Sequence, residues 1–304
     1  MYWTVYMGCP FMMIDSHHHL WDLNAVHYPW LMAQGVERFF GDPSPIQRNY
    51  LIEEFRAEAE TEGFQGSVHI QVGAESALKE ARWVQGVADA NPDWALAQIV
   101  YCDLTADDLN AQLDHFQQLT TVRGVRQIVG RAPEEDSQTG TNDLLKDPRF
   151  AEGLREVGRR GLSFDLQLIP ELMEQTAKVL ETAPDTSVAL CHAGSPHDRS
   201  IEGLERWTSS LKSLSGLPSV NCKLSGLGMF DHHWEVENFR PLVETVLNQF
   251  GSNRVMFGSN FPVDKLYSDY KKLAQSFRQL IPSEMHGAVF GKTAAKFYGF
   301  GDIH

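Results

Sequence analysis

Three consecutive histidines follow an aspartate in the segment MIDSHHHLWD, residues 13–22, and these side chains are the first candidates for chemistry in the chain. Apolar residues lead into and out of the run, which predicts the end of a β-strand rather than a purification tag. With the two-residue period of a strand, Asp15, His17 and His19 face one way while His18 faces the other. The His-x-His pair can belong to a metal site, because neutral imidazole is a common metal ligand, or it can be a chance run.

The elements that must position these residues alternate regularly along the chain. Short β-branched runs predict strands at residues 13–18, 67–72, 95–101, 123–129, 161–168, 187–192, 219–225 and 254–259. Helical patterns lie between or after them, at residues 51–63, 76–92, 105–119, 147–161, 170–184, 201–214, 238–251, 269–280 and 285–300. The helix over 105–119 is expected to begin at an N-cap, Thr105. Eight strands, each followed by a helix, predict an α/β fold of the (β/α)8 TIM-barrel type.

The barrel is expected to form a single domain over residues 13–304, preceded by an irregular extension over residues 1–12. The main alternative is a doubly wound open sheet, which would more often carry a glycine-rich phosphate loop after its first strand. The sequence has no such loop. The apolar N-terminus lacks the charged region of a signal peptide and is too short to span a bilayer.

Composition limits the partners and the compartment. The formal net charge is -14 and the sequence pI is about 5.3, so phosphate backbones and anionic membranes are repelled. Neither nucleic acid nor a membrane is therefore expected as a partner, which leaves a small-molecule substrate. The four cysteines form no C-x-x-C pair, which fits reduced thiols in a cytoplasmic protein. The sequence does not indicate the oligomeric state.

Polar side chains fall at nearly every predicted strand end, where a TIM barrel carries its chemistry. One histidine in a strand is more often a hydrogen-bonded core residue, but the joint pattern predicts a shared wet pocket. The strand-end candidates are His17, His19, His69, Gln71, Tyr101, Arg126, Gln167, His192, Lys223 and Asn260. Two loops add aromatic or imidazole rings that can contact a substrate, with simple loop packing or solvent exposure as the alternative: Trp30 and His233.

Several of these segments resemble one protein family. IDSHHHLWD resembles the Asp-x-His-x-His signature of the amidohydrolase superfamily. VRGVRQI, LCHAGSP, CKLSGL and VMFGSNFPVD resemble its metal-dependent-hydrolase-like branch, which contains sugar-lactone lactonases and 2-pyrone-4,6-dicarboxylate lactonase. The resemblance implies that His17, His19 and His192 bind Zn²⁺ or Mn²⁺. It also implies that Arg126 and Lys223 hold a substrate carboxylate or the carbonyl oxygen.

The end of the eighth strand departs from the family pattern. The family usually has Gly-Ser-Asp there, and that Asp deprotonates the attacking water, whereas this chain has Gly-Ser-Asn with Asn260. An amide cannot act as a general base near neutral pH and is a weak neutral ligand, so the metal is expected to be weakly bound or absent. A bound metal can acidify water unaided, or hydrolysis can be lost, or another base can act, with candidates Asp264, Asp165, His69 and His192.

The resemblance implies a hydrolase, and the working hypothesis is a lactonase that opens a sugar-derived or carboxylated lactone by attack of activated water. Arg126, Lys223 or a metal would stabilise the developing oxyanion, so changing either residue to Ala is expected to lower kcat/KM by orders of magnitude. One alternative is metal-dependent decarboxylation of an aromatic or unsaturated acid. The other is a non-catalytic binding protein on the same scaffold, which Asn260 favours and the retained histidines oppose.

Overall fold

Eight parallel strands form a nearly closed barrel in the computed structural model, which describes residues 11–131 and 143–301. The strands pair in chain order from β1 to β8, so the prediction of a TIM barrel is confirmed. Every predicted strand is present, with both ends within two residues of the prediction. The bounds are β1 (Ile14–His18), β2 (Gly66–Ile70), β3 (Ala95–Tyr101), β4 (Val122–Ile128), β5 (Ser163–Gln167), β6 (Val188–Leu190), β7 (Val220–Leu224) and β8 (Val255–Phe257).

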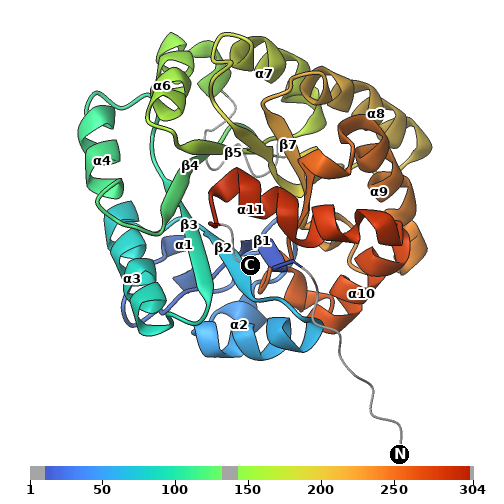
Figure 1. Ribbon diagram of the computed structural model, residues 1–304, viewed down its shortest axis with the longest axis horizontal. Coiled ribbons are helices and arrows are strands. Elements are labelled where there is room, and N and C mark those ends of the chain that lie inside the picture. Colours follow the sequence, from blue (N-terminus) through green and yellow to red (C-terminus); the bar gives the residue numbers. More distant parts are fainter. Residues whose placement is uncertain (1–10, 132–142, 302–304) are drawn as a thin grey trace, which may run out of the picture.

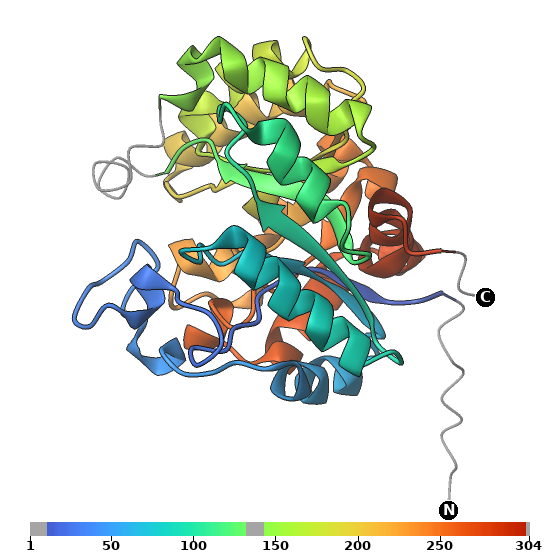
Figure 2. The ribbon, with the colours of Figure 1, turned by 90° about the vertical axis from the view of Figure 1, so that its left-hand side faces the viewer.

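Helices surround the strands, and one helix closes an end of the barrel (Figure 1). α11 (Thr293–Tyr298) crosses the middle of the ring of strands, and its Tyr298 packs with Ile14 and Met256 inside the barrel. Figure 2 shows β1 beginning at the same end as α11, whereas α1 lies at the opposite end. The other helices are α1 (Pro29–Met32), α2 (Ile52–Ala59), α3 (Ala77–Ala90), α4 (Leu109–Phe116), α6 (Pro148–Arg159), α7 (Met173–Leu180), α8 (Ile201–Ser215), α9 (Val236–Phe250) and α10 (Tyr270–Leu280).

Several predicted helices have different bounds in the structure: α2 ends at Ala59 rather than at residue 63, and α7 spans Met173–Leu180 rather than residues 170–184. The helix expected to begin at Thr105 begins instead at Leu109, because the Thr105 hydroxyl and backbone N–H both donate to Asp103 Oδ1 and form a turn. The last predicted helix, residues 285–300, is divided into a π-helical turn, Ala288–Lys292, followed by α11. None of these changes moves a strand, so the barrel is unaffected.

An irregularity in β1 decides which of its side chains enter the barrel. The β1–β2 register shifts between Asp15 and His18, so strict alternation does not hold. Ile14 packs in the barrel interior, whereas Asp15 accepts a hydrogen bond from Tyr270 of α10, outside it. The prediction that Asp15 shares a face with His17 and His19 is therefore wrong, and a bulge is the reason.

The junction between β8 and β1 closes the barrel beside the candidate site. The backbone N–H of Asn260 donates to His17 O at 2.7 Å, and that of His19 donates to Phe261 O at 2.7 Å. A Cβ at Gly258 would lie 2.6 Å from the Cβ of His17, so this close approach requires glycine. The ends of the first and last strands are thus held in a fixed relation.

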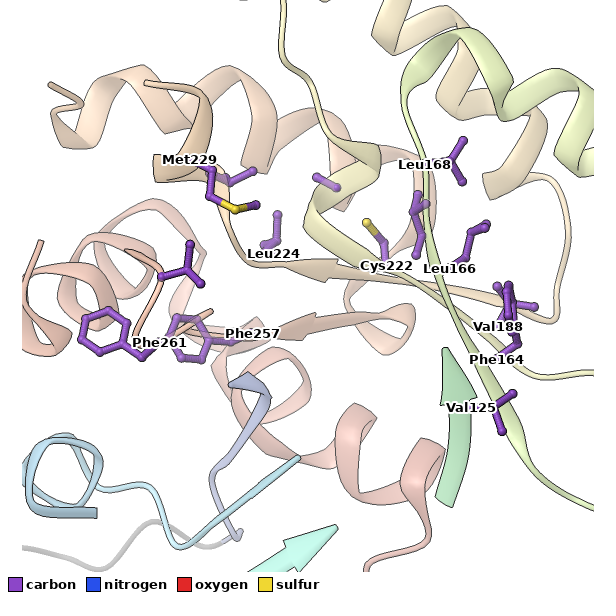
Figure 3. Close-up of a cluster of buried hydrophobic side chains, with 14 of the residues drawn as sticks. Val125, Phe164, Leu166, Leu168, Val188, Cys222, Leu224, Met229, Phe257 and Phe261 are labelled. Carbon is purple, nitrogen blue, oxygen red and sulfur yellow. The ribbon is translucent and has the colours of Figure 1, made fainter. Parts of the chain in front are cut away.

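A continuous apolar layer between strands and helices makes this frame rigid. Figure 3 shows Phe164 and Leu166 of β5, Leu224 of β7 and Phe257 of β8 in one cluster of buried side chains. All four are fully buried. Burying a side chain of this size contributes about 1.5–3 kcal/mol, and close packing resists displacement of the strand ends that carry the polar residues.

The structure describes three of the four cysteines and the last residues of the expected N-terminal extension. Cys102, Cys191 and Cys222 are buried free thiols, while Cys9 and most of the expected extension over 1–12 lie outside the described residues. Within residues 11–131 and 143–301, none of the helices combines the length and apolar character that crossing a membrane requires.

Candidate active site

A pocket of about 700 Å³, partly open to solvent, lies at the carboxyl ends of the strands. Seven of the residues singled out in the sequence line it: His19, Trp30, Gln71, Arg126, Gln167, His192 and Asn260. The remaining lining residues are Trp21, Arg38, Phe39, Phe40, Val72, Gly73, Ile128, Arg131, Met229 and Val263.

Three imidazoles converge at the bottom of this pocket. His17 lies beneath the lining, fully buried, with its ring centre 4.5 Å from that of His192 and 5.2 Å from that of His19. Neither ring nitrogen of His17 has a hydrogen-bond partner among the described residues. A buried polar group without a hydrogen-bond partner is destabilising, so the His17 ring is expected to contact a bound ion or molecule.

Burial keeps these three imidazoles neutral. Loss of solvent lowers the pKa of His17 and of His192 well below the usual value and that of His19 to about 3. His19 Nδ1 lies 2.8 Å from Ile70 O, and His192 Nδ1 lies 3.0 Å from Ser225 Oγ. Because metal ligation needs an unprotonated ring nitrogen, all three rings are in the required state near neutral pH.

The residues present fit a divalent ion. Bonds of about 2.0–2.1 Å from a tetrahedral metal to three imidazoles place the ring centres about 5 Å apart, close to the two separations found around His17. A different set, His17, Asp165 and Cys191, brings three ligand atoms within 4.8 Å of one another. Its donors are chemically less suitable than imidazoles, because Asp165 Oδ2 already accepts from Lys223 Nζ at 2.5 Å and burial raises the pKa of Cys191 to about 12.

Asn260 lies beside His19 and is backed by a carboxyl group. Its Nδ2 donates to Asp264 Oδ2 at 2.8 Å, and its Oδ1 lies 3.3 Å from His19 Nε2. The Asn260 φ of 58° is in the left-handed region, which asparagine tolerates better than most residues. Burial raises the pKa of Asp264 to about 7 despite the hydrogen bond from Asn260. Asp264 does not line the pocket, so it acts on the site through Asn260.

Three arginines give the pocket a positive lining. Arg126 is buried and donates to Gln167 Oε1 and, at 3.3 Å, to Gln71 O. Arg38 lies over the Trp30 ring at 5.4 Å, and Arg131 lies three residues after the end of β4. No aspartate or glutamate of the described residues is part of the lining. The sequence analysis missed Arg38, which lies in an irregular loop, and Arg131, although its place two residues after a predicted strand was a usable signal.

Two interior residues predicted for the site do not reach the pocket. Lys223 is fully buried below the imidazoles, where its Nζ donates to Asp165 and, at 2.7 Å, to Ser16 O. His69 faces α3 on the outside of the barrel, with Nε2 3.6 Å from Glu80 Oε1. The expectation that these two side chains line a shared wet pocket is wrong, because the barrel interior and the α3 interface supply their partners.

Two exposed residues predicted to bind substrate also lie away from the pocket. Tyr101 at the end of β3 is 39% exposed, and His233 in the loop after β7 is exposed. Neither is among the lining residues. Both were chosen for their position in the sequence, and the strand-end rule does not specify on which side of a loop a side chain lies.

An eight-stranded parallel barrel with neutral imidazoles and arginines at the carboxyl ends of its strands defines a TIM-barrel enzyme. The family model described as amidohydrolase matches residues 14–300. The chain therefore belongs to the amidohydrolase family, as the sequence motifs predicted.

Individual relatives match nearly end to end. An uncharacterized protein, y4mH, of Sinorhizobium fredii is 36% identical over 94% of this chain and 98% of its own length. An L-fucono-1,5-lactonase of Burkholderia multivorans is 26% identical over 94% of this chain and 96% of its own length. A crystal structure of a Burkholderia multivorans amidohydrolase with bound zinc has a TM-score of 0.80 at 24% identity, covering 95% of this chain and 99% of that chain. At that identity the structural likeness concerns the fold.

Proposed function

We propose that this amidohydrolase is a lactonase and that its substrate is a lactone carrying a carboxylate. The observation that carries the proposal is a pocket lined by Arg38, Arg126 and Arg131 beside neutral imidazoles, with no acidic residue in the described lining. The similarity to an L-fucono-1,5-lactonase over 94% of this chain supports a lactone as the reacting group.

Charge favours a carboxylated lactone over a neutral sugar lactone. The chain as a whole carries a formal charge of -14, so its surface repels anions and the pocket must supply the attraction. Guanidinium groups bind carboxylates through paired hydrogen bonds, worth about 1.5–3 kcal/mol when one partner is charged. A neutral lactone offers no carboxylate for such charge-assisted hydrogen bonds.

The reaction is addition of water to the ring carbonyl. The water oxygen bonds to the carbonyl carbon, the ring C–O bond breaks, the leaving ring oxygen takes up one proton of the water, and the products are a hydroxycarboxylate and one released proton. A divalent ion held by His17, His19 and His192 would supply Lewis-acid polarisation of the carbonyl and acidify water to a pKa of about 7. Arg126 is held by Gln167 and Gln71 O, and it donates to the oxygen on which negative charge develops.

When no ion is bound, His192 is the proton acceptor that the chain itself offers, because its free Nε2 lone pair can either bind an ion or take a proton but cannot do both. Of the four bases considered from the sequence, it is the one whose ring lines the pocket, since Asp165, His69 and Asp264 all face other groups. Ser225 Oγ can accept a hydrogen bond from His192 Nδ1–H, which leaves the lone pair on Nε2. The aromatic rings of Trp21, Trp30 and Phe40 cover the pocket and limit access of other water.

The test compares two lactones of the same ring size, one with a carboxylate substituent and one with a hydroxymethyl group. Ring opening is followed by proton release with chelator and with added Zn²⁺ or Mn²⁺. We expect the carboxylated lactone to have a kcat/KM at least about tenfold higher, and Arg131→Ala to remove most of that preference. Arg240→Ala, on the outer face of α9, is the matched control.

Three outcomes would overturn the proposal. Equal rates on the two lactones would refute the proposal that the arginines bind a substrate carboxylate. No ring opening of any lactone would refute the proposal that the protein is a lactonase. Proton uptake with release of CO₂ from an unsaturated acid would replace hydrolysis by decarboxylation. Activity that survives the chelator would assign the proton transfer to His192 alone.

A further inference from the structure

A tight turn over residues 38–41, in the long loop after β1, forms part of the pocket wall. Three of its side chains line the pocket: Arg38, Phe39 and Phe40. The turn is closed by two backbone hydrogen bonds, from Arg38 N–H to Gly41 O at 2.9 Å and from Gly41 N–H to Arg38 O at 2.8 Å. The preceding residues 34–37 are exposed, so the position of the 38–41 turn depends on its contacts with other loops.

The loop after β8 holds the 38–41 turn through one tyrosine. The Tyr267 hydroxyl donates to Phe40 O at 2.6 Å. Gly41 has a φ of 100°, and a Cβ at this position would collide with the same hydroxyl, so the close approach requires glycine. The hydrogen bond therefore connects the backbone of the turn, rather than one of its side chains, to the loop after β8.

The loop after β7 supports the same place from a second side. The His232 ring stacks on the Tyr267 ring, with the ring centres 3.8 Å apart and the planes 6° apart. Two residues earlier, the Phe230 ring stacks on the Phe39 ring at 5.8 Å. Neither Tyr267 nor His232 is among the described lining residues, so both can affect a bound molecule only through the turn that they hold.

We propose that Tyr267 and His232 are positioning residues that hold the 38–41 turn over the pocket, and that they thereby determine how strongly the site prefers an anionic ring to a neutral one. They act through Arg38, because this guanidinium is on the turn and is one of the positive charges of the lining. The inference rests on the proposed function for its ligand class, a ring that carries a carboxylate, but it does not require that ring to be opened.

The expected effect follows from the fraction of molecules whose turn is in place. The apparent dissociation constant is the intrinsic constant divided by that fraction, so a weaker anchor weakens binding without changing any direct contact. One hydrogen bond changes an equilibrium constant by about 2- to 12-fold. An anionic ring loses a charged partner when Arg38 moves away, whereas a neutral ring loses only the contacts with the aromatic rings of the turn.

The first experiment measures binding by isothermal titration calorimetry. The ligands are two cyclic ethers of the same ring size, which lack the carbonyl group and cannot be opened, one with a carboxylate and one with a hydroxymethyl group. We expect Tyr267→Phe and His232→Ala each to raise the Kd of the carboxylated ether about 3- to 10-fold and to lower the preference for it at least about threefold. His232→Phe keeps a flat ring on Tyr267 and should bind like the wild type. Tyr101→Phe is the matched control, since this exposed tyrosine is not part of the described lining.

Limited digestion of the folded proteins with trypsin reports on the turn itself. Trypsin cuts after arginine, and a turn that is less firmly held exposes its backbone more often. The bond between Arg38 and Phe39 should therefore be cut at least about threefold faster in Tyr267→Phe and in His232→Ala than in the wild type. The bond after Arg48, later in the same loop, is the internal reference.

Each other outcome contradicts the inference. Unchanged cleavage after Arg38 in both variants would show that neither residue anchors the turn. Faster cleavage with an unchanged preference for the carboxylated ether, or equal weakening of both ethers, would refute the effect on selectivity. A wild type that does not prefer the carboxylated ether would overturn this inference together with the proposed ligand class. If Tyr267→Phe does not fold, His232→Ala decides. A preference that the variants weaken, without opening of any lactone, would refute the lactonase and leave this inference standing.

Discussion

Replacing Lys223 by methionine is expected to destabilise the barrel rather than to remove a group that touches substrate. Lys223 is fully buried, and its Nζ donates to Asp165 Oδ2 at 2.5 Å and to Ser16 O at 2.7 Å. Methionine keeps most of the volume of the side chain but leaves the Asp165 carboxylate with no cation beside it. The remaining hydrogen bond to Asp165 Oδ1 comes from the Tyr298 hydroxyl, at 3.0 Å.

The expected loss of stability follows from the buried Asp165 charge that Lys223→Met leaves without a partner cation. Removing one partner of a buried ion pair costs about 3–5 kcal/mol, and the Tyr298 hydroxyl still stabilises the carboxylate, so we expect the lower end, about 3 kcal/mol. The double variant K223M/D165N removes both charges, while the new amide oxygen at position 165 can still accept from Tyr298. It is expected to recover most of the loss, because replacing a buried pair by neutral groups is often close to neutral.

Urea denaturation followed by circular dichroism measures these free energies of unfolding, with tryptophan fluorescence as a second probe of two-state behaviour. The kcat/KM of the folded Lys223→Met protein should change by no more than about tenfold, whereas losing a direct contact to the reacting oxygen costs about 10²–10³-fold. A variant with wild-type stability and a hundredfold loss of activity would refute this reasoning and restore the catalytic role that the sequence suggested.

Three further predictions concern pH, an aromatic ring and two exposed residues. Burial raises the Asp15 pKa from 3.8 to about 6, so the contribution of this carboxyl group to stability is present below pH 4 and is lost as pH rises through 6. The loss between pH 4 and pH 7 is at most about 3 kcal/mol of the free energy of unfolding, measured by urea denaturation. Asp15→Asn should not show this dependence on pH. Trp30→Phe removes the Nε1 hydrogen bond to Val72 O, 2.6 Å long, and should lower kcat/KM about 3- to 10-fold; an unchanged value would show that this bond does not position the ring. Tyr101→Phe and His233→Ala should keep kcat/KM within about twofold of the wild type, because neither side chain lines the pocket; a tenfold loss in either would return it to the site.

The barrel and part of the candidate site could be predicted from residue types and their order. Hydrophobic periodicity and β-branched runs depend on local burial patterns, so they located every strand to within two residues. The strand-end rule then identified His19, Arg126, His192 and Asn260, which do line one pocket. These features follow from residue type and chain order alone.

Which polar side chains contact one another depends on how the strands pair and pack. The bulge in β1 sends Asp15 outside the barrel, an effect of strand pairing that no local pattern records. Lys223 has the residue type of a substrate contact, but its neighbours from β5 and β1 make it part of a buried ion pair.

The rest of the site depends on the conformation of loops and on the orientation of side chains. Arg38 and Arg131 reach the pocket because loops fold back over it, and loop conformation depends on packing rather than on period. The direction of the Asn260 amide depends on Asp264, four residues later. Sequence gives the identity of both side chains, but a hydrogen bond of 2.8 Å between them exists only after the chain has folded.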